Sequence, residues 1–210
     1  MADWSTMASF ATAGGTLVLA AATFVSVRSA NRAARAAERS LLAGLRPVLV
    51  PSRLQDDPQK VLFVDAHWVR VPGGGGVAEA TADAIYLAMS LRNVGAGLAV
   101  LHGWTFHPER VVREQPSLRE EDFVRLTRDI YVPPGDVGFW QGAFREPSSP
   151  AFAAARAAIE ARDGMTIDLL YGDHEGGQRT ISRFVMLPRD DQSWIATVGR
   201  HWNIDRDDPR

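Results

Sequence analysis

The chain contains no cysteine. This absence excludes disulfide bonds, thiolate zinc sites and cysteine nucleophiles, and it fits a reducing compartment. Lysine is nearly absent as well, because Lys60 is the only one and arginine supplies the other basic side chains. We interpret the arginine excess as codon bias. A formal net charge of -2 gives no overall bias toward acidic partners, so we expect no nucleic-acid partner.

Catalytic and cofactor signatures are also lacking. The segment "NVGAGLA" (93–99) contains Gly-x-Gly, but a dinucleotide site needs a third glycine and a P-loop needs a lysine. We interpret it as a hairpin connection in which the loop glycines adopt positive φ and Asn93 bonds to the local backbone. No Ser-His-Asp set stands out by its spacing. We therefore assign no catalytic, cofactor or metal residues, and the sequence favours a protein without enzymatic activity.

Charged residues are missing from Trp4 to Val27, a run of 24 residues. As a helix this run would reach about 36 Å, which exceeds the hydrocarbon core of about 30 Å. Residues 1–27 therefore read as a transmembrane anchor in a lipid bilayer. A buried helix of a soluble protein would be shorter and less uniform, and a cleaved signal peptide would begin with a positive region and have a shorter apolar stretch.

Basic residues before this run are absent, whereas Arg28, Arg32, Arg35, Arg39, Arg46 and Arg53 follow it. The positive-inside rule then predicts a single pass through the cytoplasmic membrane, with the N-terminus outside and the body of the protein in the cytosol. Trp4 would lie at the outer headgroup level, where its amphipathic ring is favoured.

Arg28, Arg32, Arg35 and Arg39 are spaced four, three and four apart, which places them on one face of a juxtamembrane helix over residues 28–45 that stops at Gly44. Two interpretations stay open. The arginines would either bind anionic inner-leaflet lipids or belong to a solvated stalk that only enforces topology. Small residues spaced by four in the span, such as Ser9 and Ala13, would also suit helix packing in a homo-oligomer or complex.

The sequence pattern of the body, residues 46–204, predicts antiparallel strands. "AIYLAMSLRN" (84–93) alternates cleanly and predicts a half-buried strand. "VLFVDAHWVRV" (61–71) reads as one strand followed by a flexible loop of four glycines. Further strands are expected at 48–50, 98–107, 124–132, 138–144, 165–171, 180–187 and 194–204. So many strands with little helix predict a mainly β sandwich or barrel, and residues 205–210 form a polar tail.

Two short helices interrupt the strands. Ser149 and Pro150 are an N-cap and first-turn pair for a helix over 151–162 that Gly164 closes. "SLREEDF" (117–123) offers a capping box, Ser117 with Glu120, for one short turn.

The segments "LRNVGAGLAV" (91–100) and "YVPPGD" (131–136) resemble the strand, glycine loop, strand and later Pro-Gly-acidic turn of immunoglobulin-like sandwich modules. With the preceding span, the chain is similar to uncharacterised single-pass bacterial membrane proteins that carry an Ig-like β-sandwich. The antibody-type cysteine pair is absent, so the resemblance is one of architecture. It implies a binding or scaffolding role.

Asp173, His174 and Glu175 form the one polar cluster that draws attention as a ligand or partner loop. Consecutive residues converge poorly on one ion, so a polar hairpin loop is the simpler interpretation. His102 shares a regular strand face with Val100 and Trp104, which favours a hydrogen-bonded histidine at the edge of the core. Five tryptophans (Trp68, Trp104, Trp140, Trp194 and Trp202) favour burial in the core over a surface patch.

The leading hypothesis is a membrane-tethered, non-enzymatic interaction or scaffold module for a protein partner. The alternative is a small-ligand receptor or an enzyme, with a pocket at one end of the sandwich that uses residues 171–178 and 133–142. A structural subunit of a membrane complex belongs to the same class as the first hypothesis.

Overall fold

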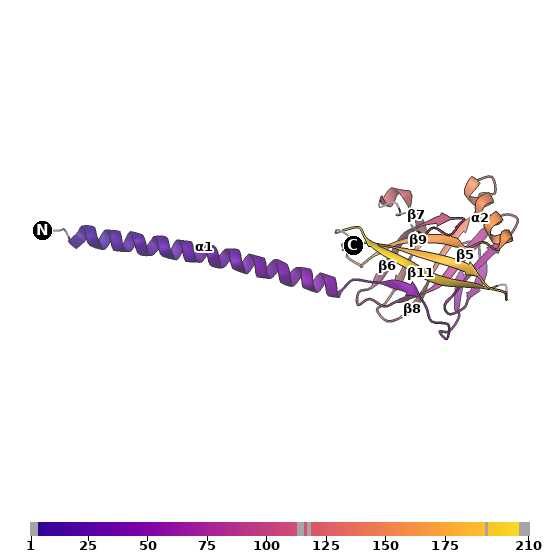
Figure 1. The fold of residues 1–210 in the computed structure, drawn as a ribbon, viewed down its shortest axis with the longest axis horizontal. Helices are drawn as coiled ribbons and strands as arrows, with labels where there is room; N and C mark the ends of the chain where they lie inside the picture. The colour runs from indigo at the N-terminus through magenta and orange to yellow at the C-terminus, as the bar shows by residue number, and fades with distance from the viewer. Residues whose placement is uncertain (1–3, 113–115, 117–118, 192, 206–210) are drawn as a thin grey trace. The chain divides into compact units, whose positions relative to one another are not determined.

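The computed structural model describes residues 4–112, 116, 119–191 and 193–205. The chain divides into two units, Met1–Gly44 and Leu45–Arg210. The first contains one helix, α1 (Trp4–Gly44), which ends at the predicted glycine (Figure 1). Among the described helices, only α1 is long and apolar enough to cross a membrane, and its segment Thr12–Leu42 is 0% buried.

The second unit, here named the β-domain, is mainly antiparallel β-structure, which confirms the predicted fold class. Its described strands are β1 (Leu49–Pro51), β2 (Gln59–Leu62), β3 (Trp68–Val71), β4 (Gly75–Ala80), β5 (Ile85–Asn93), β6 (Ala99–His107), β7 (Val124–Val132), β8 (Val137–Phe144), β9 (Met165–Gly172), β10 (Thr180–Pro188) and β11 (Trp194–Asn203). A 3-10 turn, η1 (Glu120–Asp122), precedes β7, and a helix, α2 (Pro150–Ala161), follows β8.

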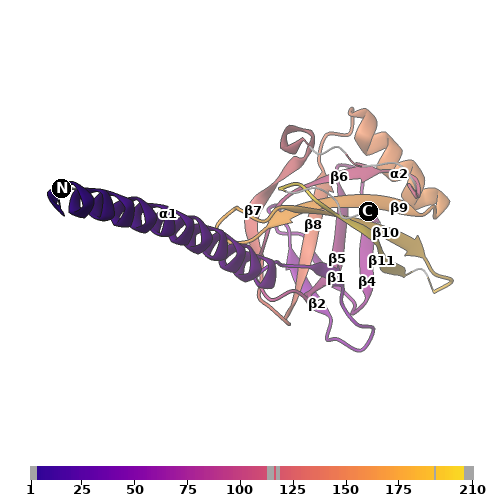
Figure 2. The ribbon, with the colours of Figure 1, turned by 60° about the vertical axis from the view of Figure 1, so that its left-hand side comes forward.

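Nine of these strands form one curled sheet. Its order is β1-β5-β4-β11-β10-β9-β6-β7, and β8 also pairs with β5. In Figure 2, β4, β5 and β8 run upright while β6 and β9 run across the view. A hydrogen bond of 2.9 Å from Arg128 Nη2 to Gln141 Oε1 joins β7 to β8. The expected division into two sandwiched sheets is not confirmed, because the described strands form one continuous sheet and a separate hairpin.

The hairpin of β2 and β3 covers the outside of β5 and corrects two expectations. Residues 61–71 are two strands rather than one, since the chain reverses at Ala66, which has a φ of 61°. Strand β5 is buried on both faces rather than half-buried. Leu87 and Met89 face the interior cluster, whereas Tyr86 and Ala88 pack under the hairpin.

The glycines act through close approach of the backbone more than through loop flexibility. Gly73 and Gly74 form a turn where a loop of four glycines was predicted, but Gly75 and Gly76 already belong to strand β4. The segment 94–98 is not a hairpin loop either, because β5 and β6 do not pair with each other. A Cβ on Gly97 would lie 1.7 Å from the Leu45 carbonyl oxygen. Asn93 is buried there and donates to the carbonyls of Gly97 and Val132.

Helix α2 begins as predicted and ends earlier. Ser149 Oγ accepts a hydrogen bond of 3.2 Å from the Phe152 amide, and Pro150 is the first helical residue. The helix ends at Ala161, and its C-cap Arg162, with a φ of 58°, supplies the left-handed position expected near Gly164. The short turn η1 has no side-chain cap, and Ser117 lies outside the described residues.

Candidate functional site

A β-bulge in β6 decides where His102 points. Leu101 pairs with Tyr171 of β9, and Gly103 pairs with the next residue, Leu170, so His102 is one extra residue in the ladder. Leu101 and Trp104 therefore both face the interior. His102 lies on the opposite, outer face, so the prediction that it shares a face with Trp104 was wrong. A bulge of this kind commonly re-aims a side chain beside a functional site.

An open cleft of about 960 Å³ lies on this outer face. Its apolar lining comes from β6, β7, β9 and the ends of the chain segments beside them: Leu101, Phe123, Leu126, Leu170 and Ile204. Its charged lining contains both signs: Arg119, Glu120, Glu121, Arg125, Asp129 and Arg179. The volume is in the range of ligand pockets, which is about 300–1,000 Å³.

Ion pairs hold most of the charged side chains of the cleft. Arg179 contacts Glu120 of η1 and lies 3.1 Å from the Asp205 carboxylate. Arg119 contacts Glu121 within the same turn. Arg125 forms no ion pair with any residue that the structure describes, so its guanidinium is the donor group most open to a ligand.

The surroundings of His102 favour its neutral form. Burial of the imidazole and, second, the positive charge of Arg179 lower its pKa below the usual value of about 6.5. Its Nε2 atom is buried and has no hydrogen-bond partner among the described residues. A Cβ on Gly172 would lie 3.2 Å from this nitrogen, so the small residue leaves room for the ring. A neutral imidazole can both accept and donate hydrogen bonds.

A buried ion pair lies on the same outer face of the sheet. Arg183 donates two hydrogen bonds, of 2.7 and 2.6 Å, to the Asp168 carboxylate, and its guanidinium lies 5.3 Å from the Trp202 ring. Burial alone would raise the pKa of Asp168, but the hydrogen bonds from Arg183 and His107 outweigh it and lower the pKa. Because both partners are less than 5% exposed, this pair fastens β9 to β10 and does not offer reactive groups to solvent.

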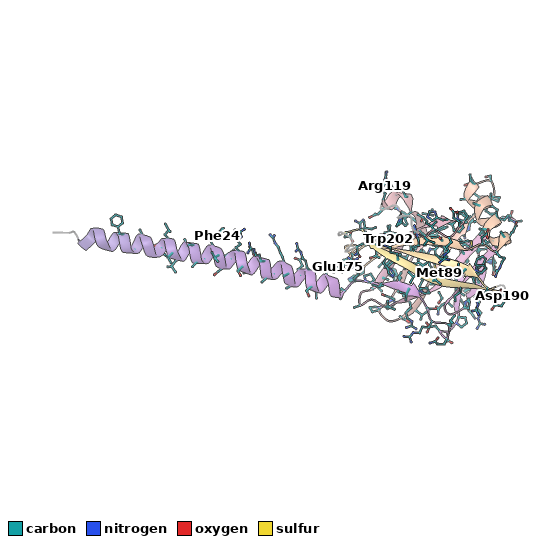
Figure 3. The ribbon with its side chains drawn as sticks, in the orientation of Figure 1. Phe24, Met89, Arg119, Glu175, Asp190 and Trp202 are labelled. Atoms are coloured by element: carbon teal, nitrogen blue, oxygen red, sulfur yellow. The ribbon has the colours of Figure 1, made fainter. Side chains whose placement is uncertain are left out.

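The predicted ligand loop is the turn between β9 and β10. The Asp173 carboxylate accepts a hydrogen bond of 2.8 Å from the Gly177 amide and so shapes the turn. His174 and Glu175 are exposed, with 4.0 Å between Nε2 and Oε1. Figure 3 labels Glu175 and Asp190 at opposite ends of the β-domain. Gly176 of this loop and Arg179, which follows it, line the cleft. Residues 133–142, the other segment predicted for a pocket, do not line the cleft.

The other predicted residues lie elsewhere. Arg28, Arg32, Arg35 and Arg39 are exposed along α1. Among the described residues, no group of three His, Asp or Glu side chains could hold a metal ion. Sequence reasoning missed Arg125 and Arg179, which come together only through folding. The signal available for the bulge was Gly103, because a glycine within an alternating strand often marks one.

Comparison with protein-family models, with curated proteins and with solved structures finds no match for this chain.

Proposed function

We propose that the chain is a single-pass, membrane-anchored binding module whose β-domain recruits a protein partner through the cleft around His102 and Arg125. The observation that carries the proposal is the exposure of α1. Phe10, Leu17, Val18, Leu19, Phe24 and Val25 are all more than 60% exposed. Apolar surface of this extent is unfavourable in water by roughly 25 cal/mol per Å², and a bilayer would cover it.

The polar residues of α1 are compatible with lipid. The hydroxyls of Thr16 and Thr23 donate to the carbonyls of Thr12 and Leu19, at 2.9 and 2.8 Å. These bonds satisfy both hydroxyls within the helix, as crossing hydrocarbon requires. The arginines after Val27 favour the orientation that leaves the β-domain in the cytosol.

The absence of cysteine makes the topology directly testable. Single cysteines would be introduced at Ser5 and, in a separate variant, at the exposed Asp190, and cells would be treated with a membrane-impermeant maleimide. We expect Ser5→Cys to react in intact cells and Asp190→Cys to react only after permeabilisation. Labelling of Asp190→Cys in intact cells would reverse the orientation, and release of the chain from membranes by carbonate would refute the anchor.

The cleft is tested by recovery of a partner. The full chain would be isolated in mild detergent and its co-purifying proteins quantified by mass spectrometry. We expect a stoichiometric partner whose recovery falls severalfold with Arg125→Glu, because this change reverses the charge of a cleft arginine that forms no ion pair with the described residues. Arg189→Glu, on the distant turn between β10 and β11, is the matched charge reversal and should leave recovery unchanged. Equal recovery with both variants contradicts the assignment of the cleft.

A small-ligand receptor is the second candidate, because the volume of the cleft suits a ligand of drug-like size. Native mass spectrometry of the detergent-solubilised chain separates the two candidates. A retained small molecule that is lost with Arg125→Glu, without a protein partner, favours the receptor.

A further inference from the structure

The β2–β3 hairpin has one buried and one exposed face. The cross-strand register pairs Lys60 with Arg70 and Leu62 with Trp68. Val61, Val69 and Val71, on the other face, are buried against the sheet. The four paired residues Lys60, Leu62, Trp68 and Arg70 therefore share the outer face, which we name the hairpin face.

Folding does not account for the composition of the hairpin face. Trp68 is 61% exposed, whereas Trp104, Trp140, Trp194 and Trp202 are each at most 5% exposed. The adjacent Val64 is 67% exposed. Lys60 and Arg70 are like charges directly opposite each other, an arrangement that destabilises a strand pair. Two cations and a tryptophan at this position point to an external partner.

Neighbouring acids do not neutralise these cations. Asp65 accepts a hydrogen bond of 2.7 Å from the Tyr86 hydroxyl and is paired with Arg145. Glu79 lies 2.9 Å from His67. Within the described part of the chain, neither Lys60 nor Arg70 forms an ion pair. A third cation, Arg128, borders a hollow of about 220 Å³ beside Leu62 and Val64.

We propose that the hairpin face docks onto an anionic bilayer surface. The cations would bind lipid phosphates and carboxylates, and Trp68 would enter the headgroup layer, where its amphipathic ring is favoured. The inference rests on the proposed membrane anchor, which keeps the bilayer at a high local concentration and so favours lipid over an acidic protein. Arg28, Arg32, Arg35 and Arg39 would act in the same direction, because they follow the span and would attract the anionic headgroups of the same leaflet.

The test uses the full-length chain in vesicles. A single cysteine at Val64 would carry an environment-sensitive nitrobenzoxadiazole probe, and the vesicles would contain phosphatidylcholine alone or mixed with phosphatidylserine. We expect a blue shift of the probe and quenching by spin-labelled lipid in the anionic vesicles only. Added salt should reverse both effects, since the attraction is electrostatic.

The matched variants separate charge from folding. Lys60→Glu with Arg70→Glu keeps two like charges opposite each other but makes them negative. This double variant should abolish the blue shift and the quenching of the probe in anionic vesicles. Arg110→Glu with Arg189→Glu reverses two exposed cations outside the hairpin, and this double variant should keep the blue shift and the quenching in anionic vesicles. Far-ultraviolet circular dichroism checks that both double variants fold.

Each result leads to a decision. An equal probe response in both lipid mixtures, or an equal response from both double variants, overturns the docking proposal, and an acidic protein would then be the partner to seek. If the chain floats with vesicles while the probe stays silent, only the hairpin proposal fails. If the chain does not float with vesicles, the anchor proposal and the docking proposal fail together.

Discussion

At the scale of residues, the buried pair of Asp168 and Arg183 makes stability depend on pH. The pKa of Asp168 is lowered in the folded protein, below the unfolded value of about 3.9. The stabilisation is therefore complete above that value and is lost as the pH falls through the folded pKa.

We expect Asp168→Asn to lower the free energy of unfolding by about 3–5 kcal/mol at pH 7, because it leaves Arg183 as a buried charge without its counter-ion. The difference in free energy of unfolding between the variant and the wild type should narrow below about pH 4, where Asp168 is protonated first in the unfolded chain, and further as the pH falls through the lower folded pKa. Urea unfolding at several pH values measures this. Asp190→Asn, on an exposed turn, should show no such gap, and a gap that is constant with pH would contradict the assignment.

At the scale of elements, the cap of helix α2 provides a local test. Ser149 Oγ satisfies one of the amides that the first turn leaves unbonded. Ser149→Ala should lower the free energy of unfolding by about 0.5–2 kcal/mol. The neighbouring Ser148 is exposed and does not cap the helix, so Ser148→Ala should stay within about 0.5 kcal/mol of wild type. Equal midpoints of urea unfolding for the two variants would contradict the capping role.

The connection between β5 and β6 gives a second prediction at this scale. A Cβ on Gly97 would meet the Leu45 carbonyl and force the backbone of the strand-β1 segment to move. Gly97→Ala should cost about 1–3 kcal/mol, the usual cost of overpacking. Gly199→Ala is the control, since its Cβ would have only an ordinary contact of 3.9 Å with the Arg183 carbonyl. Chemical denaturation that finds both variants equally stable would mean that the close approach is not required.

Elements with a local sequence signal could be predicted from the sequence. Features that depend on residues distant in the chain could not. Alternation in β5 and the Ser149-Pro150 pair were sufficient to place a strand and a helix. The reversal at Ala66 was missed because it uses an alanine at positive φ where turn chemistry favours glycine or asparagine. Strand β4 was missed because glycines read as a loop. The cleft could not be predicted, because Arg125 and Arg179 meet His102 only after the sheet curls.

At the scale of the whole molecule, the curled sheet has a protected centre and an exposed end. Strand β9 is buried along its length and paired on both sides, to β10 and β6. Residues 126–129 of β7 lie between the paired residues Arg125 and Ile130 and do not join the ladder to β6.

Hydrogen exchange should resolve this difference. Amides of Ile167 and Leu169 should exchange only through global unfolding, whereas those of residues 126–129 should open at a free energy lower by about 4 kcal/mol or more. Exchange of the full chain, read by mass spectrometry of peptides, gives both values. Uniform protection across β7 and β9 would contradict this division into a protected centre and an exposed end.

The bulge in β6 also means that His102 has no partner residue in the ladder to β9. Removing this single residue by deletion would restore regular alternation, with Leu101 and Trp104 still inside and Gly103 still outside. We expect a chain shortened by this one codon to lose the imidazole and to keep Leu101 and Trp104 in the interior. Such a deletion, unlike a substitution, would test whether the extra residue in the strand is needed for binding of a ligand or partner in the cleft.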